Sequence, residues 1–190
     1  QRAAGDSGGR WQSGSPNVWA PLSVDEENGL VYVPTGNPSP DLYGGQRRGL
    51  DYYGSSVVAL DLDSGEPAWH FQTVHHDLLD KDLPCPPILL TVKHGGKTID
   101  ALAQGTKHGL LFVFDRVSGK PLWPVEERPV PASSLAGEQA WPTQPFPTRP
   151  PPLMRQGYTE ADASDISPET HQLTLDRIKA SPNFGPFPAP

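Results

Sequence analysis

The chain has 190 residues and a formal net charge of −7, and its fifteen basic residues are scattered along the sequence. A nucleic-acid-binding surface needs clustered Lys and Arg, so this class of function is excluded. Twenty-four prolines and nineteen glycines beside 35% hydrophobic residues argue against a helical bundle, and they favour an all-β fold of short strands joined by frequent turns.

The two ends and the single methionine indicate an internal fragment of a longer protein. The chain begins at Gln1, its only methionine is Met154, and it ends in the proline-rich sequence NFGPFPAP. It contains no apolar run of about eighteen residues and no basic stretch followed by an apolar one, so neither a membrane span nor a signal peptide is expected within it. Cys85 is the only cysteine, so no internal disulfide is expected.

In chain order, the sequence predicts two successive sets of four antiparallel strands. Each strand is a short apolar run bounded by turn residues. The turns 25–29 and 93–97 have hairpin chemistry and join the first two strands of each set. The predicted strands are Val18–Val24, Gly29–Pro34, Ser56–Leu62 and Ala68–Thr73 in the first set, and Pro87–Val92, Thr98–Ala103, Leu110–Asp115 and Leu122–Glu126 in the second.

The sequence repeats itself at an offset of 54 residues: VALDLDSGEPAW, which begins at Val58, corresponds to FVFDRVSGKPLW, which begins at Phe112. In both copies an apolar strand ends at an Asp, and a Ser-Gly turn follows in which glycine supplies a positive φ. A Trp comes four residues after the glycine and is expected to cover the edge of a neighbouring sheet. Strand-only units with a period of about 40–55 residues are typical of a β-propeller with four-stranded blades.

Beyond about Glu127 the strand pattern stops. Residues 129–190 hold more than half of the prolines, and a short helix is expected only over Thr170–Lys179. Two blades cannot close a ring, so most of the propeller is expected outside this chain. The expected divisions are a lead-in loop over 1–17, a blade with a long functional loop over 18–84, a second blade over 85–127, and an irregular Pro-rich insertion over 128–190.

In an up-and-down blade the turns alternate between the two faces of the propeller, and the unusual residues all fall on one face. The two hairpins and the two Ser-Gly turns, which are short and generic, fall on the opposite face. The unusual face receives the long loop 35–55, the segment HHDLLDKDLP at 75–84, the link 104–109 and the side chain of Trp19. Long polar loops on one face of a rigid scaffold are where binding and catalytic sites are built.

Taken one at a time, these residues also have ordinary structural explanations. Asp80 fits a solvated loop carboxylate, Lys107 a surface lysine, and Trp19 a packing residue. His75 and His76 are adjacent, so their side chains point to opposite sides of an extended chain and a shared metal ion is not expected. The residues alone leave these alternatives open.

Longer stretches of the sequence resemble one enzyme family: GSPNVWAPLSVDEENGLVYVPTGNPSPDLYGGQRRG, YGSSVVALDLDSGEPAWHFQTVHHDLLDKDLP, TKHGLLFVFDRVSGKPLW and PTQPF. They resemble the membrane-bound quinoprotein dehydrogenases that use pyrroloquinoline quinone (PQQ), most closely the glucose and quinate dehydrogenase group. The resemblance runs in register from about Gly14 to Phe146. It implies two central blades of an eight-bladed propeller with PQQ in a funnel near the axis, within a longer chain that has an N-terminal membrane anchor.

The resemblance assigns roles to three positions. The family's proposed catalytic base falls on Asp80, the lysine that contacts the quinone carbonyls falls on Lys107, and a tryptophan near the cofactor falls on Trp19. A carboxylate can take the hydroxyl proton as hydride leaves the carbon, an ammonium stabilises negative charge at the quinone oxygens, and an indole stacks on a flat ring system. The family's divalent ion, Ca²⁺ or Mg²⁺, is expected to have its ligands outside this segment.

The sequence departs from the family's pattern beside the expected base. Leu79 stands where the family has Trp, Lys81 puts a cation next to Asp80, and Cys85-Pro86 replaces a small polar pair. The cation stabilises the ionised form of Asp80, and the loss of the indole changes the wall of the pocket. These departures bear on the choice of substrate rather than on the chemistry.

The resemblance implies that the parent protein oxidises a sugar or polyol hydroxyl, a glucose-like aldose to its lactone in the first instance. It implies electron transfer through PQQ to ubiquinone at the periplasmic side of the bacterial inner membrane. A quinate- or shikimate-type dehydrogenase is the alternative within the family, and a non-enzymatic propeller scaffold, which tends to have shorter loops, is the alternative outside it. The isolated fragment is expected to be inactive, because an open ring exposes sheet edges and lacks the metal ligands.

Overall fold

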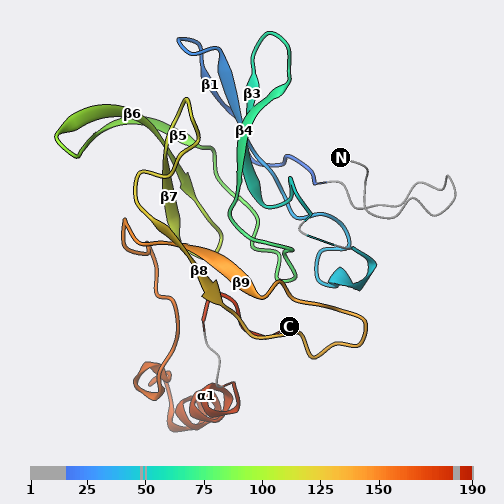
Figure 1. Cartoon of the computed structure of the whole chain (residues 1–190). Coiled ribbons are helices and arrows are strands. Elements are labelled where there is room, and N and C mark those ends of the chain that lie inside the picture. Colours follow the sequence, from blue (N-terminus) through green and yellow to red (C-terminus); the bar gives the residue numbers. More distant parts are fainter. Residues whose placement is uncertain (1–15, 48, 50, 182–184, 190) are drawn as a thin grey trace, which may run out of the picture.

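The computed structural model describes residues 16–47, 49, 51–181 and 185–189, so most of the predicted lead-in loop lies outside the described residues. The first blade is an antiparallel sheet with the strand order β1-β2-β3-β4 (Figure 1). Its first strand begins at Ser23 and not at Val18, because Pro21 has no backbone N–H to donate to a ladder. The strands are β1 (Ser23–Asp25), β2 (Leu30–Pro34), β3 (Ser56–Asp61) and β4 (Pro67–Gln72).

The second sheet has three strands, β5 (Ile88–His94), β6 (Lys97–Gly105) and β7 (Leu111–Asp115), in that order. The predicted fourth strand, Leu122–Glu126, is wrong. The chain makes a single bridge between Phe114 and Pro121 and one hydrogen bond from the Leu122 N–H to β7 before it turns away. Pro121 and Pro124 have no N–H, so a ladder beside β7 cannot continue.

The chain after Pro124 builds a separate two-stranded antiparallel sheet. β8 (Val125–Pro129) pairs with β9 (Thr143–Pro147), which lies within the predicted insertion. β9 was not predicted, because its prolines hide the strand pattern. Val125 and Phe146 pack against the main core, so this sheet is attached to the blades.

The C-terminal region contains the 3₁₀-helix η2 (Glu160–Asp162) and the α-helix α1 (Pro168–Ala180). α1 extends the expected helix Thr170–Lys179 at both ends, because Ser167 caps its first turn and Pro168 fits the first helical position. Figure 1 shows α1 apart from the sheets. Among the described helices there is none with the length and apolar character that a membrane crossing requires.

The internal repeat is reproduced in atomic detail. The Oδ1 of Asp61 accepts hydrogen bonds from the backbone N–H and the hydroxyl of Ser64, at 2.8 and 2.7 Å. The Oδ1 of Asp115 accepts the same two hydrogen bonds from Ser118, also at 2.8 and 2.7 Å. The two copies of the motif therefore form the same turn at the same place in successive blades.

Trp69 covers the edge of the next sheet, as the repeat predicts. Its ring centroid lies 5.9 Å from that of Phe114 and 5.8 Å from that of Tyr32, and its indole N–H donates to the carbonyl of Arg116 at 3.2 Å. The main core joins the two blades and consists of Leu30, Tyr32, Val57, Ala59, Leu83, Leu102, Leu110, Phe112 and Phe114.

The two turn glycines provide a matched pair of substitutions. Gly65 and Gly119 have φ values of +72° and +69°; a Cβ on Gly65 would meet open space, whereas one on Gly119 would lie 2.4 Å from the Trp69 indole. We expect Gly65→Ala to lower the free energy of unfolding by about 1 kcal/mol through the left-handed backbone alone. Gly119→Ala should cost about 1–3 kcal/mol more, because the indole must move. Equal losses in denaturant unfolding would contradict this packing.

Candidate functional site

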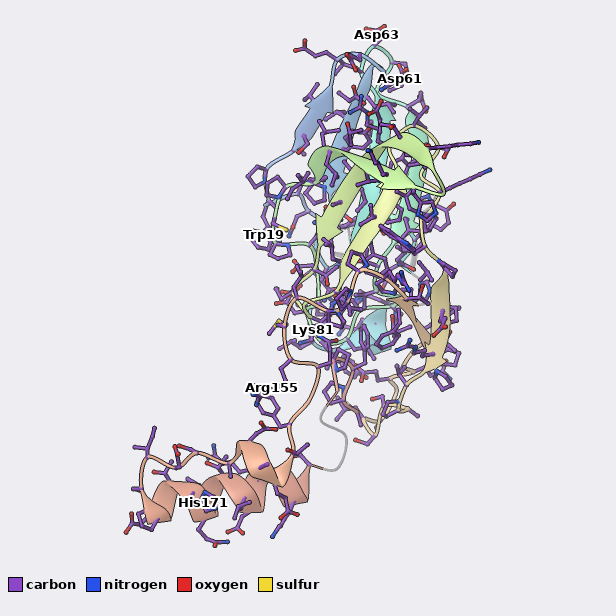
Figure 2. The ribbon with its side chains drawn as sticks, turned by 90° about the vertical axis from the view of Figure 1, so that its left-hand side faces the viewer. Trp19, Asp61, Asp63, Lys81, Arg155 and His171 are labelled. Carbon is purple, nitrogen blue, oxygen red and sulfur yellow. The ribbon has the colours of Figure 1, made fainter. Side chains whose placement is uncertain are left out.

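Three loops gather at the end of the blades that lies opposite to the Ser-Gly turns. They are the long loop 35–55, which contains the 3₁₀-helix η1 (Gly44–Gln46), the segment 75–84 and the link 104–109. Figure 2 shows Asp61 and Asp63 of a Ser-Gly turn at one end, with Trp19 and Lys81 toward the other. The generic turns and the unusual loops are therefore separated, as the blade topology predicts.

A buried carboxylate, Asp77, shapes the segment that follows β4. Its Oδ1 accepts the N–H of Leu79 at 3.0 Å, and its Oδ2 accepts the N–H of Lys81 at 2.7 Å and the hydroxyl of Ser55 at 2.8 Å. Burial raises the pKa of Asp77, although these hydrogen bonds oppose the shift. The resulting turn leaves Asp80 in the left-handed region with a φ of 52°, which Asp tolerates better than most residues.

The long loop is joined to this segment by a buried ion pair that the sequence did not predict. Arg47 pairs with Asp51, and the Nδ1 of His76 lies 2.9 Å from the Oδ2 of Asp51. Arg47 also donates hydrogen bonds to the carbonyls of Asp77 at 2.6 Å and Pro40 at 3.2 Å. The local sequence around Arg47 gives no signal that separates it from a solvated surface arginine.

Trp19, Asp80, Asp82 and Lys107 form a group that we call the lysine cluster. The Nζ of Lys107 lies 2.9 Å from the Oδ2 of Asp80 and 2.7 Å from the Oδ1 of Asp82. The indole N–H of Trp19 donates to the Oδ2 of Asp82 at 2.8 Å, and the Lys107 ammonium lies 5.9 Å from the centroid of that ring. The structure thus brings together the three residues that the sequence singles out, and it adds Asp82.

The members of the lysine cluster differ in exposure. The side chain of Asp82 is 6% exposed, that of Lys107 34% and that of Asp80 43%, while Trp19 is 54% exposed. Burial lowers the pKa of Lys107, but contacts with Asp82 and Asp80 outweigh it, so the pKa lies above its ordinary value and the ammonium stays charged at neutral pH. The Oδ1 of Asp80 accepts no hydrogen bond from the residues that the structure describes.

The two adjacent histidines serve different parts of the loop packing. The Nδ1 of His75 lies 2.7 Å from the Oε1 of Gln72, and its Nε2 lies 3.0 Å from the Oε1 of Glu127. His76 is turned toward Asp51 instead. In the part of the chain that the structure describes, no group of three or more His, Cys, Asp and Glu side chains has the arrangement of a metal site.

Residues between 144 and 156 hold the loops 75–84 and 104–109 through their backbones. The side chain of Gln144 in β9 accepts the N–H of His75 at 2.8 Å and donates to the carbonyl of the same residue at 2.7 Å. The N–H of Leu153 donates to the carbonyl of Gly109 at 2.8 Å. The side chain of Gln156 donates to the carbonyl of His108 at 2.9 Å. These contacts were not predicted, because a proline-rich sequence carries no periodic signal of where it packs.

His108, next to Lys107 in the chain, is buried, and neither of its ring nitrogens has a hydrogen-bond partner among the described residues. Burial, with a smaller contribution from the charge of Lys81, lowers the pKa of His108 from 6.5 to about 3. Between about pH 3 and pH 6.5 the unfolded chain binds a proton at His108 that the folded chain excludes. The free energy of unfolding therefore rises with pH over this range, and it falls as the solution is acidified.

We expect acidification from pH 6.5 to pH 5 to remove about 2 kcal/mol of stability through His108. Denaturant unfolding of the full-length protein at the two pH values measures this loss. In the His108→Gln variant the corresponding part of the pH dependence should disappear. An unchanged pH dependence in that variant would contradict the assignment.

Comparison with known proteins shows to which family the chain belongs. The family described as "PQQ: Glucose/ethanol/alcohol dehydrogenase, beta-propeller domain" matches residues 1–190. The "Probable quinate dehydrogenase (quinone)" of Xanthomonas campestris pv. juglandis is 45% identical over 100% of this chain and 24% of its own length. The "Quinoprotein glucose dehydrogenase A" of Acinetobacter calcoaceticus is 46% identical over 66% of this chain and 16% of its own length.

Solved structures with a similar fold include an alcohol dehydrogenase. The quinohemoprotein alcohol dehydrogenase from Comamonas testosteroni matches with a TM-score of 0.57 and 32% identity, over 70% of this chain and 20% of that protein. The chain spans about a quarter of the length of the curated relatives that match all or nearly all of it. Its antiparallel sheets are blades of a partial β-propeller, and the chain belongs to the family of PQQ-dependent dehydrogenases, as part of their β-propeller domain.

Proposed function

We propose that this chain supplies part of the active site of an enzyme that oxidises a sugar or polyol hydroxyl with PQQ, a glucose-like aldose to its lactone in the first instance. The observation that carries the proposal is the pairing of Asp80 with Lys107 beside the exposed indole of Trp19. In this proposal, residues 18–84 and 85–127 are two blades, and residues 128–190 are an insertion that supports the functional loops.

The lysine cluster fits PQQ by its chemistry. PQQ is a flat, negatively charged tricyclic quinone, for which the indole face of Trp19 offers stacking and the Lys107 ammonium offers a donor to the quinone oxygens. When bound, PQQ supplies the acceptor for the hydride that leaves the substrate carbon. The family's divalent ion, Ca²⁺ or Mg²⁺, is proposed to bind to ligands outside this chain.

Asp80 is proposed as the base that takes the hydroxyl proton. The Oδ2 of Asp80 pairs with the Lys107 ammonium, and the Oδ1 of Asp80 accepts no hydrogen bond from the described residues. As the substrate carbon loses hydride, the O–H bond breaks, the proton passes to Asp80 and a carbonyl forms. Asp77 and Asp82 are poor candidates for this step, because both oxygens of each carboxylate are engaged by protein groups.

A quinate- or shikimate-type substrate is the second candidate. The observation that favours it is coverage: the relative named as a quinate dehydrogenase matches 100% of this chain, whereas the glucose dehydrogenase of Acinetobacter calcoaceticus matches 66%. Leu79 and Lys81 flank Asp80 in the chain, and they are the positions where we propose that this choice of substrate is made.

The electron acceptor and the location are part of the same proposal. Relatives are named as quinate dehydrogenases (quinone), which supports ubiquinone as the acceptor of the full-length protein. We place its reaction at the periplasmic side of the bacterial inner membrane, with an anchor outside this chain. Reduction of a ubiquinone analogue by membranes that contain the enzyme and its substrate would test this part.

The full-length protein, made in a host without other PQQ dehydrogenases, tests the proposed function. The apo-protein is reconstituted with PQQ and either Ca²⁺ or Mg²⁺, and dye-linked oxidation of glucose, quinate and glycerol is measured. We expect turnover that depends on both PQQ and the metal. A preference for quinate would favour the quinate-type substrate over the glucose-like aldose. If none of the substrates is oxidised in a PQQ-dependent reaction, the proposed function is contradicted.

A further inference from the structure

Asp82 is the most buried member of the lysine cluster, and both of its oxygens are engaged. Its Oδ1 lies 2.7 Å from the Lys107 ammonium, and its Oδ2 accepts the Trp19 indole N–H at 2.8 Å. A buried carboxylate is costly unless charged or polar partners satisfy it. The arrangement of these three side chains is therefore interdependent: Asp82 needs both partners, and both partners are held by Asp82.

We propose that Asp82 is a positioning residue: it holds Lys107 and Trp19 in the places where they contact PQQ, and it prevents Asp80 from being the sole anionic partner of the lysine. The inference rests on the proposed function, because it takes Lys107 and Trp19 as cofactor-contacting residues. Asp82 acts through these two side chains, since its own oxygens are already used.

The two carboxylates that share Lys107 have different surroundings. Asp80 is partly exposed and keeps an oxygen unoccupied by the described residues, whereas Asp82 is buried and keeps none. Without the charge of Asp82, Lys107 would have Asp80 as its only anionic partner in the cluster, and the ionised form of Asp80 would become more stable. A more stable carboxylate is a weaker base, so the loss of Asp82 would reach the proton-transfer step through Lys107.

The contact with Trp19 is the second route by which Asp82 acts. About half of the surface of Trp19 is exposed, and its N–H is bonded to Asp82. An aromatic ring that is fixed before a ligand arrives loses less conformational entropy on binding than a mobile ring. Asp82 is therefore expected to strengthen the binding of PQQ by preorganising the indole face.

The full-length protein with Asp82→Asn tests this inference. Asn keeps the size of the side chain but removes the charge, and Asp82→Glu serves as the conservative variant. Asp63→Asn is the matched control, because Asp63 is an exposed carboxylate in a Ser-Gly turn at the other end of the blades (Figure 2). Equilibrium dialysis of the apo-proteins measures their affinity for PQQ.

The affinity for PQQ is expected to fall by about 10- to 100-fold in Asp82→Asn, because Asn has one acceptor oxygen where Asp82 uses two, so the charge-assisted contact with either Lys107 or Trp19 is lost. It should recover in part in Asp82→Glu and stay unchanged in Asp63→Asn. A second measurement is the pH profile of kcat, whose acidic limb should move to lower pH in Asp82→Asn. A merely structural role would reduce the amount of folded protein without moving that limb.

Each outcome decides the inference. If Asp82→Asn binds PQQ as tightly as the native protein and the acidic limb stays in place, the inference is overturned while the proposed function stands. If the native protein does not bind PQQ, both fall together. If Asp82→Asn does not fold, Asp82→Glu takes its place, because it keeps the charge but moves the carboxylate by one methylene. A loss of about threefold or more in PQQ affinity then supports the inference, and a smaller one overturns it.

Discussion

Replacing Asp80 by Asn is expected to lower the kcat of the full-length enzyme by about 10²–10⁴-fold, which is the range for loss of a general base. Asn has nearly the size of Asp, and its carbonyl oxygen can still accept a hydrogen bond from Lys107, so the lysine cluster should keep its geometry. The amide cannot take a proton from the substrate hydroxyl. Dye-linked turnover of the PQQ-loaded variant at saturating substrate measures the loss.

Binding of PQQ separates lost chemistry from a lost site in this experiment. Asp80→Asn should bind PQQ nearly as tightly as the native protein, because Lys107 and Trp19 are still held by Asp82. Asp82→Asn, in contrast, is expected to lose affinity for PQQ. Full turnover in Asp80→Asn would contradict the assignment of Asp80 as the base, and a parallel loss of PQQ affinity would assign it to cofactor binding instead.

Replacing Arg47 by Met is expected to lower the free energy of unfolding by about 3–5 kcal/mol, the usual cost of removing one partner from a buried ion pair. Met fills much of the space of the arginine stem but carries no charge. It leaves Asp51 buried beside His76 without its cation, and it removes the donors to the carbonyls of Asp77 and Pro40. Denaturant unfolding of the full-length protein measures the difference.

Arg155→Met provides the matched control for this loss. Arg155 pairs with Asp162 at 2.6 Å, but its side chain is exposed, so the same substitution should cost about 1 kcal/mol or less. Similar losses in the two variants would show that burial of the Arg47 pair does not matter. Because Arg47 joins the long loop to the segment that carries Asp80, its loss should also weaken PQQ binding, whereas the loss of Arg155 should not.

The blade strands could be predicted because each is bounded by residues with turn chemistry. β2 and β7 lie within one residue of their predicted ranges, and the Ser-Gly turns recur as the repeat requires. The pairing of β8 with β9 could not be predicted. It depends on where prolines deprive the chain of N–H donors, and on a partner that lies far away in the sequence rather than on a local pattern.

The site was predictable in its location and only partly in its members. Blade topology alone places the three loops at one end, and the resemblance singles out Asp80, Lys107 and Trp19. Asp80 and Asp82 are two residues apart, so the sequence allows them to share one side of an extended segment, but the intervening Lys81 and the turn at Pro84 leave this open. In the structure both carboxylates contact Lys107, in a segment whose turn is set by contacts of Asp77 with the backbone and with Ser55.

The contacts that Gln144 and Gln156 make with the loop backbones bear on how proteins of this family change over evolutionary time. Gln144 binds the N–H and the carbonyl of His75, and Gln156 binds the carbonyl of His108. Every residue except proline has both of these backbone groups, so the held positions can mutate without releasing the loop. Side chains around the site can therefore be replaced while the backbone contacts that support the loops remain in place.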